Sequence, residues 1–319
     1  MKNLLPVARA HALVQQPETR RWLIESLWTE QAVGIIGGEP KCCKSFLALS
    51  LAVAVASGKS CLGRFSVPAR GKVLIYPAED ALNIVRRRLE GICIAQNLSL
   101  EKLPIYVITL PGLRLDIDTD RQRLRETIEK IRPTLLVLDP FVRLHAIDEN
   151  ASGEVAKILH HLRLLQRSFK LAVALVHHAR KGGAKHRAGQ ALRGSSEFHA
   201  WGDSNLYLRK NKQDELSLTI EHRAEASPET IPISLQAEKT PHLQIRDETK
   251  TTTNNSKPIT PEKQIIQALQ DTNKPISTTE LRNTLPIRNA TISQILKQLQ
   301  KNGVIQKSKN GYLLTQDTD

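Results

Sequence analysis

Short apolar runs alternate with longer helical stretches along much of this 319-residue chain. This alternation predicts an α/β fold with a mainly parallel sheet and helices on both faces. The expected strands are residues 32–36, 72–76, 105–109, 134–138 and 171–176. The expected helices between them are residues 44–57, 80–95, 118–131 and 153–168.

The apolar period changes at both ends of this region. After residue 204 it becomes two, which predicts antiparallel strands at 205–209, 215–222 and 231–235 that extend the sheet. Near the start, apolar residues between 18 and 28 fall close to helical spacing, so residues 1–30 are expected to be a helical segment. The main domain is then expected to cover residues 31–245.

Residues 246–260 are polar, hold almost nothing to bury, and are typical of a linker. Beyond them, the pattern predicts helices at 261–270, 277–285 and 289–302 and a strand-turn-strand at 304–314. Residues 261–316 thus resemble a winged helix-turn-helix domain, a small α+β fold.

The composition points to a polyanionic partner. The formal net charge is +14 and the pI about 9.8, whereas aromatic residues make up only 4%, too few for widespread base stacking. No apolar run approaches the length of a membrane span, and the first residues lack a signal-peptide core, so we expect a cytoplasmic protein without membrane contact. The four cysteines show no metal-ligand spacing and are expected to be thiols.

The segment Gly38-Glu-Pro-Lys-Cys-Cys-Lys-Ser45 predicts a nucleotide phosphate-binding loop between a strand and a helix. The pattern GxxxxGK[ST] is complete except that Cys43 replaces a glycine, and a Cβ there hinders the backbone. Lys44 is expected at the terminal phosphates of ATP or GTP, and Ser45 at Mg²⁺. The alternatives are a simple turn or a loop that binds nucleotide poorly. The predicted nucleotide-binding residues are Gly38, Glu39, Pro40, Lys41, Cys42, Cys43, Lys44, Ser45 and Phe46.

Polar residues follow three of the expected strands, at the edge where open parallel sheets bind ligands. Glu79 is placed to orient and deprotonate a water, while its neighbour Asp80 better suits a helix N-cap. Asp139 is expected to be a second magnesium-organising residue. One imidazole of His177-His178 is placed to reach the terminal phosphate.

Two basic regions are candidate DNA-binding surfaces. Residues 180–193 hold five cations and three glycines without an acid, which favours a loop that grips a nucleic-acid backbone over an ordinary solvated loop. Residues 288–309 hold five further cations and no acid, although a protein-docking module would also tolerate that surface. The cations are Arg180, Lys181, Lys185, Arg187 and Arg193 in the first region, and Arg288, Lys297, Lys301, Lys307 and Lys309 in the second.

Together the motifs at 38–45, 76–80, 138–139, 177–182 and 193–196 resemble the RecA-type ATPases of the plasmid RepA hexameric helicase group, relatives of the DnaB helicases. The resemblance covers about residues 20 to 240. It implies a RecA-like P-loop core, ATP between the subunits of a ring, commonly a hexamer, and single-stranded DNA in the channel. The winged helix would bind duplex DNA.

The same resemblance implies roles for individual residues. Lys44 and Ser45 would hold phosphate and magnesium, Glu79 would be the catalytic base, Asp139 would support the metal and His178 would sense the γ-phosphate. Glu221-His-Arg223 stands where helicases have Lys-x-Arg, so Arg223 is the expected finger from a neighbouring subunit, with Arg209 and Arg193 as alternatives.

The predicted function is an ATPase that acts as a ring helicase or helicase-like motor in DNA replication. One alternative is an ATP-responsive DNA-binding regulator or loader, which Cys43, Glu221 and the appended C-terminal domain favour. A second is a recombination-type filament.

Overall fold

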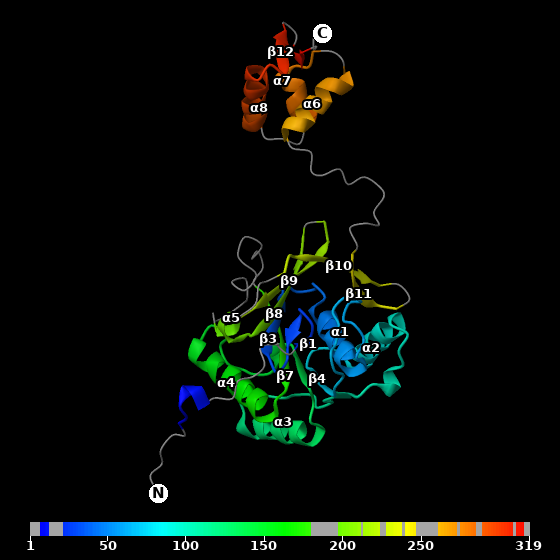
Figure 1. Cartoon of the computed structure of the whole chain (residues 1–319), viewed down its shortest axis with the longest axis vertical. Coiled ribbons are helices and arrows are strands. Elements are labelled where there is room, and N and C mark those ends of the chain that lie inside the picture. Colours follow the sequence, from blue (N-terminus) through cyan, green and yellow to red (C-terminus); the bar gives the residue numbers. More distant parts are fainter. Residues whose placement is uncertain are drawn as a thin grey trace. The chain divides into compact units, whose positions relative to one another are not determined.

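The computed structural model describes residues 7–12, 22–179, 197–211, 213–223, 228–237, 240–246, 261–272, 275–284, 289–308 and 311–315 (Figure 1). The chain divides into two compact units, Met1–Asp247 and Glu248–Asp319. Each unit has its own buried apolar core.

A nine-stranded sheet runs through the described part of the first unit in the order β11-β10-β9-β8-β3-β7-β6-β4-β5. From β8 to β5 all neighbouring strands are parallel, and β9, β10 and β11 add an antiparallel extension. The predicted antiparallel strands 215–222 and 231–235 are β9 and β10, whereas the predicted strand 205–209 is β8, which is antiparallel to β9 but parallel to β3. The parallel strands are β3 (Val33–Gly38), β4 (Val73–Pro77), β5 (Ile105–Val107), β6 (Leu135–Asp139), β7 (Ala172–His178) and β8 (Ser204–Lys210). The antiparallel strands are β9 (Leu216–His222), β10 (Ile231–Gln236) and β11 (His242–Ile245).

Helices cover both faces of this sheet (Figure 1). On one face lie α1 (Lys44–Ser57) and α2 (Leu82–Ala95), and on the other lie α3 (Asp118–Ile131), α4 (Ser152–Phe169) and the short α5 (Glu197–Trp201). Successive strand residues point to opposite faces, so Ile36 packs with α1 while Ile35 packs with α4. Because both faces are buried, the strands read as continuous apolar runs.

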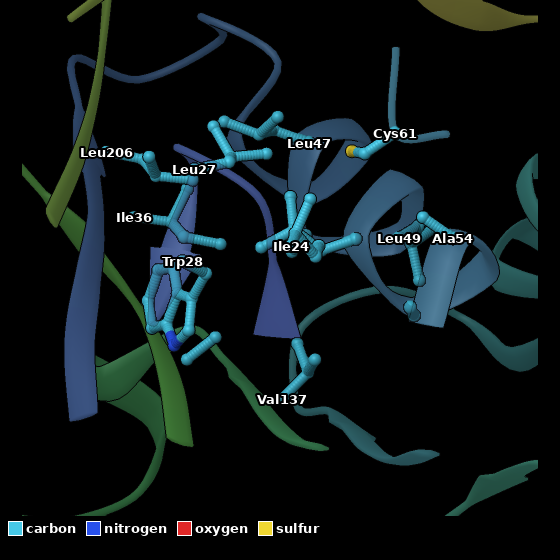
Figure 2. Packing of buried hydrophobic residues seen from close by; sticks show 14 of the residues in the cluster. Ile24, Leu27, Trp28, Ile36, Leu47, Leu49, Ala54, Cys61, Val137 and Leu206 are labelled. Carbon is cyan, nitrogen blue, oxygen red and sulfur yellow. The ribbon is translucent and has the colours of Figure 1, made fainter. Parts of the chain in front are cut away.

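The N-terminal segment corrects one prediction. The expected helix over 18–28 is wrong where the chain is described, because residues 22–29 form an antiparallel pair of short strands, β1 (Trp22–Ile24) and β2 (Trp28–Thr29). Ser26 lies between them with φ 57°, a left-handed conformation that ends a helix. Two apolar clusters separated by one turn mimic helical spacing. Figure 2 shows Ile24, Leu27 and Trp28 among the buried residues that pack near Leu47 of α1.

The sequence pattern did not predict several short elements. Helix α5 and strand β11 were not predicted, since neither is long enough to establish a period. Three 3₁₀ turns were also not predicted: η1 (Ala10–Ala12), η2 (Leu100–Lys102) and η3 (Phe141–Arg143). Within the residues described here, no helix has the length and apolar character that crossing a membrane requires.

The second unit follows the predicted order of three helices and a hairpin. Its elements are α6 (Pro261–Thr272), α7 (Thr278–Thr284), α8 (Asn289–Lys301), β12 (Ile305–Ser308) and β13 (Gly311–Leu314). A capping box precedes α7: Glu280 N donates to Ser277 Oγ at 3.2 Å and Ser277 N donates to a Glu280 carboxylate oxygen at 2.8 Å. A backbone bridge between Ile276 and Tyr312 attaches the hairpin to the start of α7.

Candidate functional site

The loop between β3 and α1 begins at a glycine that no other residue can replace without displacement. Gly38 has φ 157°, and a Cβ built there would lie 2.5 Å from the Leu208 carbonyl oxygen and 2.5 Å from the Cys42 sulfur. Such contacts are far inside van der Waals distance. The start of the loop is therefore pressed directly against the neighbouring strand β8.

Cys43 adopts the conformation for which the sequence pattern reserves glycine. It is the N-cap of α1 with φ 66° and ψ 24°, in the left-handed region. A side chain with a Cβ pays about 1 kcal/mol or more for this conformation. The loop thus keeps the backbone shape of a phosphate-binding loop and carries local strain at the position of the substitution.

Lys44 is folded back over the loop. Its Nζ donates to the carbonyl oxygens of Gly38 at 3.0 Å and Glu39 at 2.8 Å, and lies 3.9 Å from the Cys42 sulfur. Burial lowers the pKa of this ammonium. Phosphate oxygens are stronger acceptors than backbone carbonyls, so a bound triphosphate can take over these hydrogen bonds.

A cavity of about 360 Å³ opens beside the loop. Its walls come from the loop, the start of α1, α2 and the carboxyl ends of β4, β6 and β7, which meet because these strands are parallel. The Ala78 N–H donates to the Asp139 carbonyl oxygen at 2.6 Å and ties two of these strand ends together. The lining residues are Lys41, Cys42, Cys43, Lys44, Ser45, Phe46, Glu79, Asp80, Arg88, Asp139 and His178.

Asp139 and Ser45 form the part of the cavity that fits a magnesium ion. Burial raises the pKa of the Asp139 carboxyl to about 6, against the smaller opposing effects of a Ser45 hydrogen bond and the Lys44 charge. A carboxylate and a hydroxyl are oxygen ligands, which magnesium prefers. A carboxylate destabilised by burial gains from a cation placed beside it, so the residues present fit this ion.

Glu79 lies at the same edge and contacts a cation that the sequence did not indicate. Arg143 of η3 donates to a Glu79 carboxylate oxygen at 3.2 Å, and both side chains are about half exposed. The expectation for Asp80 as a helix N-cap is wrong. Helix α2 has Ala81 at its N-cap without a side-chain hydrogen bond, and Asp80 instead forms an ion pair with Arg88.

Arg88 is a cavity residue that the sequence reasoning missed. Its guanidinium lies 5.0 Å from the centre of the Phe46 ring, within cation–π range, as well as against Asp80. The Arg88 charge and that of Lys210 at the end of β8 both oppose the rise in the Cys43 pKa that burial causes. Three successive arginines, 86–88, stand on α2, and the pattern alone does not show which one faces the loop.

The two adjacent histidines at the end of β7 point to different places, as neighbours on a strand do. His178 lines the cavity. His177 is buried and its ring stacks on Phe198 of α5, with 4.1 Å between ring centres. Of the pair, His178 therefore has the position that a contact with bound nucleotide requires.

Arg223 lies away from the cavity of its own chain, at the amino end of the parallel strands. It follows β9, donates to the Ala200 carbonyl oxygen and lies 3.6 Å from the Asp203 carboxylate, which also pairs with Arg163. Arg209 is a half-buried residue of β8.

The predicted DNA-binding residues are only partly described. Lys297, Lys301 and Lys307 are exposed on α8 and β12 of the second unit. The remaining predicted cations lie outside the described residues: Arg180, Lys181, Lys185, Arg187, Arg193, Arg288 and Lys309.

Comparisons with known proteins include one family match, whose range contains the loop and all the residues that line the cavity. The AAA domain family AAA_25 matches residues 3–184 of the 319. A KaiC-like protein from the archaeon Pyrococcus horikoshii is similar at 14% identity and a TM-score of 0.47 over 70% of this chain and 94% of that one. The RadB recombinase is similar at 16% identity and a TM-score of 0.48 over 67% of this chain and 90% of that one. From the family match and the phosphate-binding loop, the chain belongs to the AAA domain family and is a P-loop ATPase.

Proposed function

We propose that the protein hydrolyses ATP with Mg²⁺ while it holds DNA. It forms a ring-shaped homo-oligomer, a hexamer, and acts as a helicase or helicase-like motor in DNA replication. The observation that carries the ATPase part is one cavity lined by Lys44, Ser45, Glu79 and Asp139. A phosphate-binding lysine, two oxygen ligands and a further carboxylate are the groups that phosphoryl transfer to water needs.

Each group has a separate task. Lys44 binds the terminal phosphates, and Ser45 and Asp139 hold the magnesium ion, which supplies neutralising charge at the phosphate oxygens. Glu79 orients the attacking water and accepts its proton, and His178 contacts the γ-phosphate. Most of the rate enhancement then comes from positioning and charge stabilisation.

The DNA part rests on charge. The net charge of +14 favours a polyanionic partner at long range, and the basic sequence 180–193 follows directly after the strand that carries His178. In the second unit, Lys297 and Lys301 are both exposed and one helical turn apart on α8. With the order helix, helix, helix, hairpin, this supports a winged helix whose α8 and hairpin contact phosphates of duplex DNA.

A second candidate is an ATP-responsive DNA-binding regulator or loader that turns over slowly. Two observations favour it: Cys43 holds a left-handed backbone at the heart of the loop, and Arg223 is paired within its own chain by Asp203. A strained loop would slow hydrolysis and weaken nucleotide binding only a few-fold, and an Arg223 held within its own chain would slow hydrolysis without changing the binding site.

ATP turnover with and without single-stranded DNA, measured beside strand displacement on a forked duplex, separates the two. A motor shows DNA-stimulated hydrolysis and displaces the strand. Hydrolysis without displacement excludes the helicase, and tight duplex binding with almost no hydrolysis supports the regulator. Absence of ATP binding would exclude both.

Mass in solution with and without ATP tests the assembly. A ring gives one discrete mass that ATP stabilises. A series of increasing masses on DNA would instead support a recombination-type filament.

A further inference from the structure

Four buried rings next to the nucleotide cavity form a continuous cluster, called here the ring stack, in which His177 and Phe198 lie face to face and the other pairs are tilted or edge-on. The centre of the Phe141 ring lies 4.3 Å from that of His145, 5.8 Å from that of His177 and 5.1 Å from that of Phe198. The rings of His177 and Phe198 are stacked, with 4.1 Å between their centres and 25° between their planes. Phe141 and Phe198 have no exposed surface. Aromatic pairs at these separations favour defined relative orientations, so the stack holds its members in fixed places.

The stack joins segments that belong to different parts of the chain. Phe141 and His145 come from η3 and the residues after it, His177 from the end of β7, and Phe198 from α5. Helix α5 lies beside β8 and α4 (Figure 1) and contributes no residue to the cavity lining. Its single large buried side chain, Phe198, reaches inward to the other rings.

Two residues of the stack are connected to residues at the cavity. His177 precedes His178, which lines the cavity. Phe141 opens the short 3₁₀ turn that ends in Arg143, whose guanidinium binds the Glu79 carboxylate at 3.2 Å. The place of Arg143 therefore depends on Phe141, and the place of Phe141 depends on Phe198.

We propose that Phe198 is a positioning residue for hydrolysis, which acts through Phe141 and Arg143 to orient Glu79 towards the attacking water. Half-exposed Glu79 has freedom to take several rotamers, and the Arg143 contact selects one of them. The ring stack fixes the backbone from which Arg143 extends. This inference rests on the proposed ATPase function and adds a role for residues outside the cavity.

The first test is the kinetics of Phe198→Leu beside a matched control, Phe65→Leu. Phe65 is also buried but belongs to the core on the opposite face of the sheet. Phe198→Leu should lower kcat about ten-fold or more while the KM for ATP changes less than about two-fold, because the nucleotide contacts remain and only the base is misplaced. Phe65→Leu should leave kcat within about two-fold. Equal loss of kcat in both variants would overturn the proposal. If Phe198→Leu does not fold, Phe198→Met takes its place, because the flexible methionine side chain adapts to an irregular gap.

A double-mutant cycle tests the route through Arg143. Arg143→Ala should lower kcat to a similar extent, and adding Phe198→Leu to Arg143→Ala should lower it little further, since the stack acts only by placing that guanidinium. Multiplicative losses would show that Phe198 acts independently of Arg143, and would contradict the proposal.

Hydrogen exchange in the nucleotide-free protein separates failure of this proposal from failure of the proposed function. Backbone amides of 141–146 should exchange faster in Phe198→Leu than in wild type and in Phe65→Leu. Unchanged exchange there overturns the inference even if the protein is an active ATPase. If Phe198→Leu exchanges faster at these amides but the wild-type protein hydrolyses no ATP, the link between Phe198 and residues 141–146 is supported and the ATPase function is rejected.

Discussion

At the carboxyl edge of the nine-stranded sheet, charged side chains line a cavity, whereas at the amino edge Asp203, Arg163 and Arg223 form one network. Lys44 is held by two backbone carbonyls of its own loop, and Asp139 carries a pKa raised by burial. At the amino edge, Asp203 accepts from Arg163, lies near Arg223 and also accepts from the Val33 N–H at 3.2 Å. At the carboxyl edge, burial disfavours the charged forms of Lys44 and Asp139. At the amino edge, opposite charges are paired.

This difference distinguishes residues suited to bind a ligand from residues that stabilise the fold. Lys44 and Asp139 would both gain from a partner that the protein itself does not supply, namely a phosphate and a cation. Arg163 already has a carboxylate and a backbone carbonyl, of Trp201, and is mostly covered. Replacing a residue at the first edge should therefore change activity, and replacing one at the second should change stability.

The largest expected effect is that of Lys44→Met. Turnover of ATP should fall by about 10³-fold or more, because the cation at the transferred phosphate is lost. Steady-state ATPase measurements check this, with Lys59→Met, an exposed lysine just beyond α1, as the control. A loss smaller than about ten-fold would show that this edge is not a site of phosphoryl transfer.

Asp139→Asn should lower ATPase activity and raise the stability of the ligand-free protein at neutral pH but not at acidic pH. The folded carboxyl releases its proton near pH 6 and the unfolded one near 3.8, so the folded state binds more protons between these values and wild-type stability falls as pH rises through that window. The variant avoids this loss, worth up to about 3 kcal/mol above pH 7 and nothing below pH 4.

Thermal unfolding of wild type and Asp139→Asn at pH 4 and pH 7.5 measures that difference. With Mg²⁺ and ATP present the order should reverse at pH 7.5, since only the wild type can hold the ion. The exposed Glu129→Gln serves as the control for removal of one acid. A Tm gain of equal size at both pH values would contradict a buried, raised carboxyl.

At the amino edge, Arg163→Met should lower the free energy of unfolding more than Arg223→Met does. The Arg163 side chain is 18% exposed and its loss should cost about 1–3 kcal/mol, because the partly covered Asp203 is left with weaker partners. The Arg223 side chain is 56% exposed and its loss should cost less than about 1 kcal/mol. Urea unfolding curves of the two variants compare these free energies of unfolding.

Arg223→Met also tests the finger. If Arg223 serves a neighbouring subunit, turnover of this variant falls by about 10³-fold although its stability is nearly unchanged. Mixing it with Lys44→Met should then restore part of the activity, because mixed rings contain sites with an intact loop from one subunit and an intact finger from the next. No recovery in verified mixed oligomers, or full activity of Arg223→Met alone, would leave this arginine as a purely structural residue.

The smallest effect is expected for Cys43→Gly. Relief of the left-handed backbone should stabilise the fold by less than about 1 kcal/mol, since the flexible glycine also stabilises the unfolded chain. Removal of the Cβ from the cavity should tighten nucleotide binding a few-fold. Titration with a fluorescent ATP analogue measures this, and Cys43→Ala, which keeps the Cβ, should bind as wild type does. Equal gains in both variants would assign the effect to the thiol instead.

The carboxyl edge was more predictable from the sequence than the amino edge. Helices α1 and α3 have the predicted bounds, and Glu79 and Asp139 could be placed at one edge because parallel strands end together. Arg88 could not be chosen from three successive arginines, because its selection depends on how α2 is rotated against α1. The strand pattern alone did not separate His178 from His177, and the choice of His178 came from the family resemblance. The structure places His178 at the cavity and His177 against Phe198.

The amino edge depends on contacts between residues far apart in the chain. Nothing near Arg223 in the sequence shows that Asp203 and Ala200 hold it. The N-terminal strands were misjudged for a similar reason, since burial of Trp28 in the core, with its indole N–H bonded to the Ala32 carbonyl oxygen at 3.3 Å, selected a turn over a helix.

Strand β8 connects the two edges, and its contact with Gly38 gives it a mechanical role. The strand begins at Ser204, beside Asp203, and ends at Lys210, close to the phosphate-binding loop. At Gly38 the loop approaches the Leu208 carbonyl so closely that even a Cβ would not fit between them. We therefore expect a shift of the loop on nucleotide binding to be felt by β8, the strand that begins directly after Asp203, the partner of Arg223.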